Sequence, residues 1–421
     1  MPDRGAREVF GAFLRLGATS FGGPVAHLGY FREELVVKRR WVGERQYAEL
    51  VALCQFLPGP TSSQVGFALG LIRGGYRGAL AAWVAFTLPS ALLLVLFAYG
   101  AVSLDNAAGR GLLVGLKAVA VAVVAHAVWG MARTLAPDAR RIAIGIAAAG
   151  SALLVPGNLG QIGAVALGLV AGLLFCRSLA QPLEASARGG RQRSPQGAET
   201  DPPVPVSPRA GIVSLVVLVL VLTGLPLAAR LTHQGWAVVA DAFTRTGALV
   251  FGGGHVVLPL LQAEPAVSQL VPPEPFLAGY GAAQAVPGPL FSFASYLGFE
   301  MGSGPDGGPT AWMLALLALV AIFLPGFLLL VAALPFWGAI RERRAARAAV
   351  AGANAAVVGI LAAALWSPVI TSGITGPASL LIALGCLLLV SVRHLPVWIA
   401  VAAGAGAGIL LGLLADPLAM S

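Results

Sequence analysis

Charged residues are scarce in this sequence. They make up 11% of its 421 residues, whereas soluble globular domains carry about 25%. Hydrophobic residues make up 57%. This balance excludes an ordinary soluble domain and predicts an all-α integral membrane protein, because helices satisfy their own backbone hydrogen bonds in lipid. Residues 1–7 are polar, and the apolar segment after them has no small-residue cleavage site, so we expect no signal peptide.

Cysteine and histidine are also scarce. The three cysteines, Cys54, Cys176 and Cys386, lie apart in apolar runs and suggest neither a disulfide framework nor a metal site. The five histidines are scattered. The sequence contains no His-Glu-x-x-His, no Gly-x-Ser-x-Gly and no pair of aspartates within an apolar segment. We therefore expect a protein that is not an enzyme and that has no metal and no cofactor.

The net charge is nevertheless +9. Its basic residues adjoin apolar segments, as Lys38, Arg39 and Arg40 do. Anionic lipid attracts basic residues in such places. We therefore expect a lipid bilayer and not a nucleic acid as the partner of these charges, and a homodimer is left open.

Long apolar runs with almost no charge are abundant. A helix needs about 20 apolar residues to cross a bilayer, and nine runs predict full spans, two of which form a tight pair (142–156 and 158–176). The stretch 178–210 is instead polar, Pro-rich and cationic, which is typical of a disordered linker. The predicted spans are 78–104, 111–132, 142–156, 158–176, 211–229, 311–335, 349–366, 377–392 and 396–414.

The sequence repeats itself. Residues 13–23, FLRLGATSFGG, recur at a spacing of 230 as residues 243–253, FTRTGALVFGG, and QFLPGP at 55–60 recurs as QAVPGP at 284–289. Matched Gly/Pro breaks in two halves of a membrane protein mark a transport site. We divide the chain into an N-terminal repeat (1–177), a cytoplasmic linker (178–210), a connecting span (211–229) and a C-terminal repeat (230–421).

Glycine and proline break four further apolar segments, 8–31, 46–73, 237–262 and 276–299. Each segment could cross the membrane once, which gives thirteen spans, or could enter and leave on one side as a re-entrant helical hairpin, which gives nine. Both counts predict an inverted repeat, because the unpaired connecting span turns the second half over. We favour the re-entrant arrangement.

The loop charges set the orientation. Loop 31–45 has five basic residues, whereas its counterpart 263–275 has two glutamates and no Lys or Arg. Basic loops stay on the cytoplasmic side. We therefore expect a multi-pass protein of the bacterial inner membrane with loop 31–45 and the N-terminus in the cytoplasm.

The breaks also predict the chemistry of the site. Pro24, Pro60 and Pro289 each suit the first position of a new helix after a break. Helix starts present free N–H groups and about half a positive charge each. Arg15 and Arg245 lie six residues before their Phe-Gly-Gly, and charge at membrane depth marks a pathway. This pattern predicts a site for a divalent tetrahedral anion, and the carbonyls that end the preceding helices leave a coupling cation open.

At these motifs the chain resembles the chromate ion transporter (CHR) family in its long, two-domain form. Phe-Gly-Gly-Pro at 21–24 and Gln-x-x-Pro-Gly-Pro at 55–60 carry the resemblance. It implies an inner-membrane permease that exports chromate, with sulfate as a related anion, is driven by the membrane potential or proton gradient, and confers chromate resistance. The second copy departs from the motif, since Gly254 replaces Pro24, so the two halves need not contribute equally.

Two equivalent polar positions complete the candidate site. Lys117 lies in span 111–132 where the second copy has Asn354, and it is either a substrate contact or a snorkelling or paired residue. The candidate substrate-binding residues are Arg15, Phe21, Gly22, Gly23, Pro24, Gln55, Pro58, Gly59, Pro60, Thr61, Ser62, Lys117, Arg245, Gly252, Gly253, Gly254, Gln284, Pro287, Gly288, Pro289, Ser292 and Asn354.

The sequence leaves two alternative functions open, a passive anion channel and a sulfate permease with the same fold. A channel would share the hairpins of a secondary active transporter. It could not, however, concentrate an anion against its electrochemical gradient.

Overall fold

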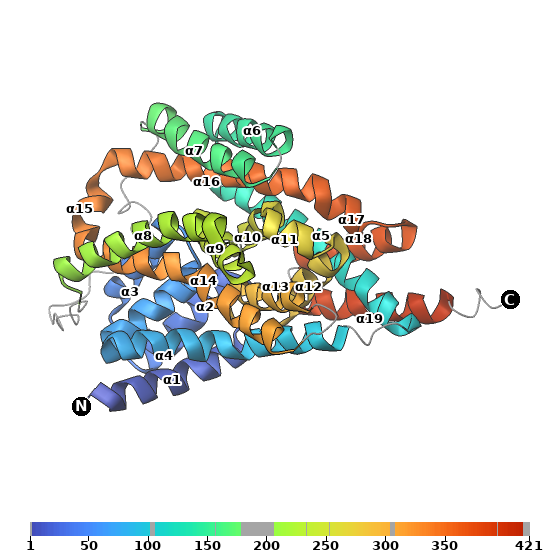
Figure 1. The fold of residues 1–421 in the computed structure, drawn as a ribbon, viewed down its shortest axis with the longest axis horizontal. Helices are drawn as coiled ribbons and strands as arrows, with labels where there is room; N and C mark the ends of the chain where they lie inside the picture. Colours follow the sequence, from blue (N-terminus) through green and yellow to red (C-terminus); the bar gives the residue numbers. More distant parts are fainter. Residues whose placement is uncertain are drawn as a thin grey trace.

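The fold is that of a computed structural model, which describes residues 2–101, 106–155, 157–177, 206–232, 234–251, 253–303, 308–393 and 395–415. Within those ranges the regular elements are all helices, with no strand (Figure 1). The all-α fold class is therefore confirmed.

The helices follow the expected division of the chain. The first repeat contains α1 (Pro2–Thr19), α2 (Gly23–Phe31), η1 (Arg32–Lys38), α3 (Glu44–Phe56), α4 (Thr61–Ala101), α5 (Ala107–Leu135), α6 (Ala139–Leu154) and α7 (Asn158–Phe175). The connecting helix is α8 (Pro208–Thr232). The second repeat contains α9 (Gly235–Leu249), η4 (Gly254–Val256), α10 (Val257–Ala263), α11 (Pro265–Leu270), α12 (Pro273–Ala285), η5 (Leu290–Ser292), α13 (Phe293–Gly302), α14 (Pro309–Ala333), η6 (Leu334–Phe336), α15 (Trp337–Glu342), α16 (Arg344–Ala364), η7 (Leu365–Ile370), α17 (Thr371–Gly373), α18 (Pro377–Ser391) and α19 (Val397–Ala415).

Six helical stretches of the described chain are long and apolar enough to cross a membrane. They are Thr61–Gly100, Ala107–Leu135, Pro208–Thr232, Pro309–Ile340, Arg344–Gly373 and Val397–Leu414. The expected spans 158–176 and 377–392 correspond to shorter apolar helices, and 142–156 falls in the 16-residue α6. Most of the expected linker, 178–205, lies outside the described residues, and α8 already begins at Pro208.

All four broken segments are interrupted where glycine and proline predict an interruption. In the first repeat, α1 ends at Thr19 and α3 at Phe56, each a few residues before the next helix. In the second repeat, α9 ends at Leu249 and α12 at Ala285 in the same way. Short helical turns, η4 and η5, restart the chain after the two later breaks. Each segment is thus two helical arms joined by non-helical backbone.

Two equivalent hydrogen bonds join the breaks of the two repeats. The Gly59 N–H donates to the Val250 carbonyl at 2.7 Å, and the Gly288 N–H donates to the Ser20 carbonyl at 2.9 Å. Gly59 and Gly288 have φ angles of 123° and 105°, which only glycine adopts readily. The second break of each repeat is therefore bound to the first break of the other repeat. This explains why Pro-Gly-Pro is retained in both copies.

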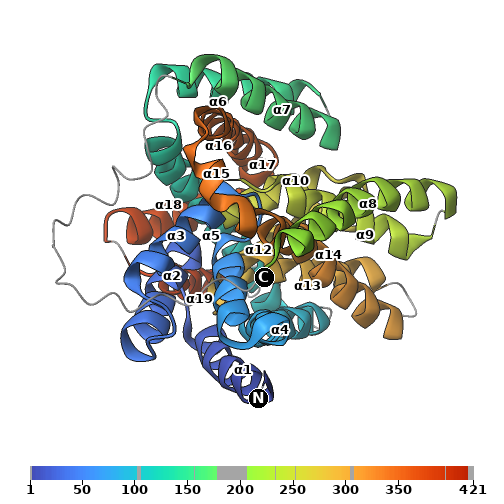
Figure 2. The same cartoon turned by 90° about the vertical axis from the view of Figure 1, so that its left-hand side faces the viewer.

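The repeats also exchange helices. Helix α5 of the first repeat packs along α18 and α19 of the second, whereas α16 of the second packs along α6 and α7 of the first (Figures 1 and 2). Glycines allow these close backbone contacts: a Cβ at Gly115 would collide with the Gly404 carbonyl, and one at Gly352 would collide with the Gly168 carbonyl. The two halves are therefore intertwined.

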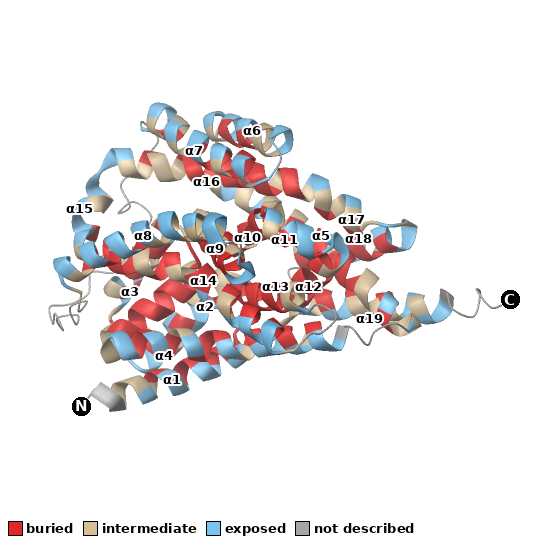
Figure 3. Ribbon diagram, viewed as in Figure 1, coloured by how far each residue is buried: buried red, intermediate tan, exposed pale blue. Residues whose placement is uncertain are grey.

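Buried residues gather in the middle of the molecule, where α4, α13 and α14 meet (Figure 3). The connecting helix α8 lies on the outside, and its residues Ile212 and Val213 are 54% and 61% exposed. An apolar helix with such exposure suits a surface that faces lipid. The polar breaks, by contrast, lie in the protein interior.

Candidate functional site

A cavity of about 660 Å³ lies beside the breaks. This is within the range of about 300–1,000 Å³ that is usual for small-molecule sites. Its wall combines α2, α3 and the facing ends of α5 and α6 from the first repeat with η4 and α16 from the second. The cavity thus lies between the repeats, where transporters with internal repeats bind substrate.

Seven of the predicted site residues line this cavity: Gly22, Pro24, Gln55, Thr61, Gly253, Gly254 and Asn354. The Asn354 Oδ1 atom is buried and has no hydrogen-bond partner in the described structure. Turning this amide by 180° would present its two N–H donors instead. Gln55, Thr61 and Asn354 therefore give the wall neutral groups that can donate hydrogen bonds to an oxyanion.

Two arginines that the sequence analysis did not assign to the site also line the cavity. Arg141 starts α6 and lies 2.8 Å from Asp138, and Arg347 is in the second turn of α16. The lining residues that the structure describes include no Asp or Glu. One signal could have indicated Arg347: α16 begins with Arg344 and Arg347 and has no acid in its first turn. Cations at a helix start oppose the macrodipole, so they need a compensating anion or another reason to be there.

Two smaller voids lie deeper among the breaks. One, of about 40 Å³, is lined by Gly22, Gly23, Pro24, Gln284 and Gly288 among others. The other, of about 10 Å³, is lined by Pro24, Pro60, Thr61, Ser62, Gly254, Pro289, Leu290 and Phe291. The starts of the helices that follow all four breaks therefore meet around one point.

The expectation of free backbone N–H groups at every break needs correction. The N–H groups of Gly59 and Gly288 donate to carbonyls of the opposite repeat, so they hold the repeats together and do not face an anion. His27 ties the same region together: its Nδ1 lies 3.3 Å from Ser62 Oγ and its Nε2 lies 3.2 Å from the Ser20 carbonyl. These contacts make the centre of the breaks rigid.

Other predicted residues lie away from these three spaces. The Phe21 ring packs 6.0 Å from the ring of Trp398, and Ser292 Oγ donates to the Pro289 carbonyl at 2.7 Å. Gly252 lies outside the described residues. The predicted residues that line none of the three spaces are Arg15, Phe21, Pro58, Gly59, Lys117, Arg245, Pro287 and Ser292.

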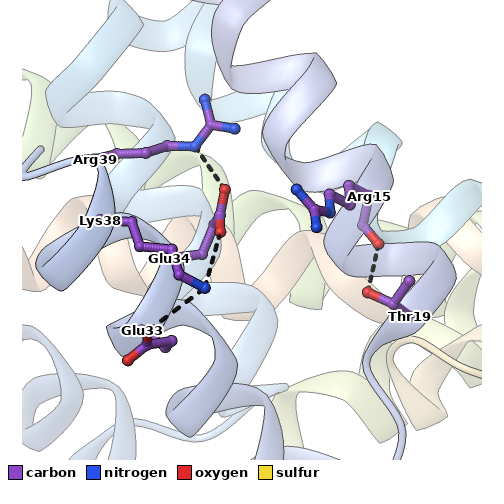
Figure 4. Close-up of polar contacts among 6 residues, drawn as sticks. All are labelled: Arg15, Thr19, Glu33, Glu34, Lys38 and Arg39. Carbon is purple, nitrogen blue, oxygen red and sulfur yellow. Dashed lines mark hydrogen bonds and ion pairs between the residues drawn. The ribbon is translucent and has the colours of Figure 1, made fainter.

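The structure does not bring Arg15 and Arg245 together at one anion. Arg245 donates to both carboxylate oxygens of Glu264, at 2.9 and 2.7 Å, and to Asp241 at 2.9 Å. Arg15 lies exposed on α1, where its backbone carbonyl accepts a bond from Thr19 (Figure 4). The paired-arginine prediction is corrected on this ground, because two carboxylates already surround the Arg245 guanidinium.

Lys117 is buried in α5 and is 7% exposed. Its ammonium group makes no hydrogen bond or ion pair with any other residue that the structure describes. A buried cation without a partner is costly. Lys117 and its equivalent Asn354 therefore differ in the present structure, since only Asn354 lines the large cavity.

The family model described as "Chromate transporter" matches this chain twice, at residues 7–174 and 236–409. The chain belongs to the chromate transporter family. The two matches to this family confirm the two repeats and leave out the linker and α8.

Chromate transporters from distant bacteria are similar over most of the chain. It is 27% identical over 374 residues to the "Chromate transport protein" of Pseudomonas aeruginosa, which covers 86% of this chain and 80% of that protein. It is 26% identical over 420 residues to the "Chromate transport protein" of Cupriavidus metallidurans, covering 99% and 95%. A "Probable chromate transport protein" of Synechococcus elongatus is 26% identical over 372 residues, covering 86% and 84%. No solved structure matches the chain.

Proposed function

We propose that this protein is a secondary active transporter that exports chromate, or a related tetrahedral oxyanion such as sulfate, across the bacterial inner membrane and so confers chromate resistance. The observation that carries the proposal is the cavity between the repeats, where Arg141 and Arg347 lie with Gln55, Thr61 and Asn354, with no carboxylate among the described lining residues. Arginine pairs well with oxyanions through its planar set of N–H donors.

Inverted repeats form part of this proposal. Elements related by a two-fold axis make the same contact twice, each time with the partners exchanged. The bonds Gly59–Val250 and Gly288–Ser20 follow this rule, and so does the exchange of the α6–α7 and α18–α19 pairs. An axis in the membrane plane would invert the second repeat. Re-entrant hairpins around the breaks and a cytoplasmic N-terminus complete the proposed topology.

The cavity then opens toward the cytoplasm. Its outer wall includes Thr134, Arg141 and Arg347, which adjoin the basic loops 133–141 and 341–347. Basic loops favour the cytoplasmic side. In this arrangement the structure corresponds to a state that receives the anion from inside the cell, as an exporter requires.

Loop labelling tests the topology. We expect a cysteine placed at Arg40 to react with an impermeant maleimide only in inverted vesicles, and a cysteine at Ser268 to react in whole cells. Both positions are exposed, and their loops carry opposite charge, which sets opposite sides. The background lacks Cys54, Cys176 and Cys386. Reaction of both cysteines from the same side would overturn the inverted arrangement.

Chromate flux tests the function. Inverted vesicles that contain the protein should concentrate labelled chromate above the external level, and excess sulfate should compete if both oxyanions share the site. An ionophore that collapses the driving gradient should abolish the accumulation and leave only equilibration. Equilibration without accumulation under every gradient would support the passive channel instead, and accumulation of sulfate but not chromate would support the sulfate permease.

A further inference from the structure

An arginine and a glutamate recur together in the two repeats. Arg15 and Glu34 stand in the first repeat where Arg245 and Glu264 stand in the second, at the same spacing of 230. In each repeat the arginine precedes the first break and the glutamate follows it. Both members of an ion pair have thus been kept on the two arms of the same broken segment.

In the second repeat this pair is closed. The Arg245 guanidinium donates to both oxygens of Glu264, at 2.9 and 2.7 Å, and the Glu264 side chain is only 3% exposed. Two parallel N–H···O bonds between Arg and carboxylate form a strong and directional contact. The contact joins the end of α10 to α9 and so holds the two arms together.

In the first repeat the equivalent pair is open. Glu34 instead binds Arg39 at 2.9 Å and Lys38 at 3.9 Å. The Arg15 guanidinium makes no hydrogen bond or ion pair with another described residue, and Figure 4 draws it on α1 across from Glu34, with no contact between the two. The same two residue types therefore occupy two different states within one molecule.

The state of each pair corresponds to the space next to it. Glu34 lies in η1, between α2 and α3, and both of these helices line the cavity of about 660 Å³. Its equivalent Glu264 lies between α10 and α12, and the void lined by Gln284 of α12 has only about 40 Å³. The open pair adjoins the open space, and the closed pair adjoins the closed one.

We propose that the two Arg–Glu pairs are the gates of the transport pathway, and that they close in alternation. This inference rests on the proposed transport function. In the state that faces the other side of the membrane, Arg15 binds Glu34 and closes the large cavity, while Arg245 releases Glu264 and the smaller void opens. The fold itself gives the geometry for the first closure, because the second repeat already holds the equivalent pair in contact.

The charges around each pair make this exchange feasible. At Glu34, Arg15 has to replace Arg39, whose side chain is 33% exposed, and partly exposed ion pairs of this kind contribute little stability. In the second repeat Asp241 also binds Arg245, at 2.9 Å. The Arg245 charge therefore keeps a partner when Glu264 leaves. Neither step leaves an isolated charge in the protein interior, which would be costly.

A reporter cysteine inside the cavity tests the gates without chromate. Ala351 lines the cavity, so Ala351→Cys, in a background without the three native cysteines, should react with an impermeant maleimide added to inverted vesicles. Glu264→Gln weakens the closed gate and favours the opposite state, so it should slow this reaction severalfold. Arg39→Gln frees Glu34 for Arg15 and should slow it as well. Adding Arg15→Gln to either variant should restore the rate.

Arg45→Gln is the matched control, because Arg45 is in the same loop and pairs only with the nearby Glu49 in an 86% exposed position. It should leave labelling unchanged. Equal labelling in all variants, or slow labelling that Arg15→Gln does not restore, would overturn the gates. Pro265 follows Glu264 where Leu35 follows Glu34, and a pair fixed by this difference alone would give that result. The Arg39 and Arg15 variants change exposed residues, so they still test the inference if Glu264→Gln fails to fold.

Labelling and flux separate the two proposals. Normal chromate accumulation with unchanged labelling would sink the gates and leave the proposed function standing. Altered labelling without any chromate accumulation would sink chromate as the substrate and leave the gates standing. Repeating the labelling in whole cells shows from which side the cavity is reached in each variant.

Discussion

Replacing Arg347 by glutamine should weaken the apparent affinity for chromate about 10- to 150-fold, because a charge-assisted hydrogen bond contributes about 1.5–3 kcal/mol and each 1.4 kcal/mol is tenfold. Arg347 lines the cavity between the repeats, and the described lining has no carboxylate that could take the place of the anion. Lysine keeps the charge but loses the planar set of donors, so Arg347→Lys should restore affinity only in part. The measurement is the KM of chromate uptake into inverted vesicles, normalised to folded protein.

Arg344 offers a matched control in the same helix. It is exposed, lies one turn earlier in α16 and does not line the cavity. Arg344→Gln removes the same charge from the same loop, so any effect through topology or the surface potential should appear equally in both variants. A loss of affinity shared by both variants would attribute the effect to loop charge and remove Arg347 from the site.

The positions of the breaks could be predicted from the sequence because they are set by local chemistry. Glycine permits positive φ, and proline removes an N–H donor, so both end helices whatever surrounds them. Gly59 and Gly288 illustrate this: both have positive φ in the structure, and both lie in the Pro-Gly-Pro motif that marked the breaks. The repeat was equally clear, since it rests on residue identity at a fixed spacing.

The partners of the breaks could not be predicted, because they come from distant parts of the chain. The Gly59 N–H was expected to face an anion, but it donates to Val250, which is 191 positions later in the sequence. Arg245 was expected to face an anion as well. The glutamate that binds it, Glu264, was assigned only to loop charge. Its recurrence at the position equivalent to Glu34 was the available signal for the pair.

Valine at two glycines of the breaks should fail in different ways. A Cβ at Gly23 meets no atom within 4 Å, whereas a Cβ at Gly59 would lie 3.1 Å from Gly326 Cα and 2.9 Å from Gln64 Nε2. Both glycines have positive φ, 77° and 123°, and such backbone costs a residue with a side chain about 1–3 kcal/mol. At Gly59 overpacking adds about 1–3 kcal/mol. This total is a large part of the about 5–15 kcal/mol that stabilises a typical protein.

Gly59→Val should therefore lose most of the folded protein in detergent extracts, as measured by size-exclusion chromatography, because it also disrupts the bonds of Gln64 Nε2 to the Pro58 and Gly326 carbonyls. Gly23→Val should keep more folded protein but abolish chromate uptake per folded molecule, since Gly23 lines the void of about 40 Å³ between the breaks and the new side chain would fill it. Gly385→Val is the control: it lies in α18, has helical backbone and no atom within 4 Å of an added Cβ, so both measurements should stay near wild type. Full uptake by Gly23→Val would show that the space among the breaks is not part of the pathway, and the anion would then have to pass along the wall formed by α3, α5 and α16.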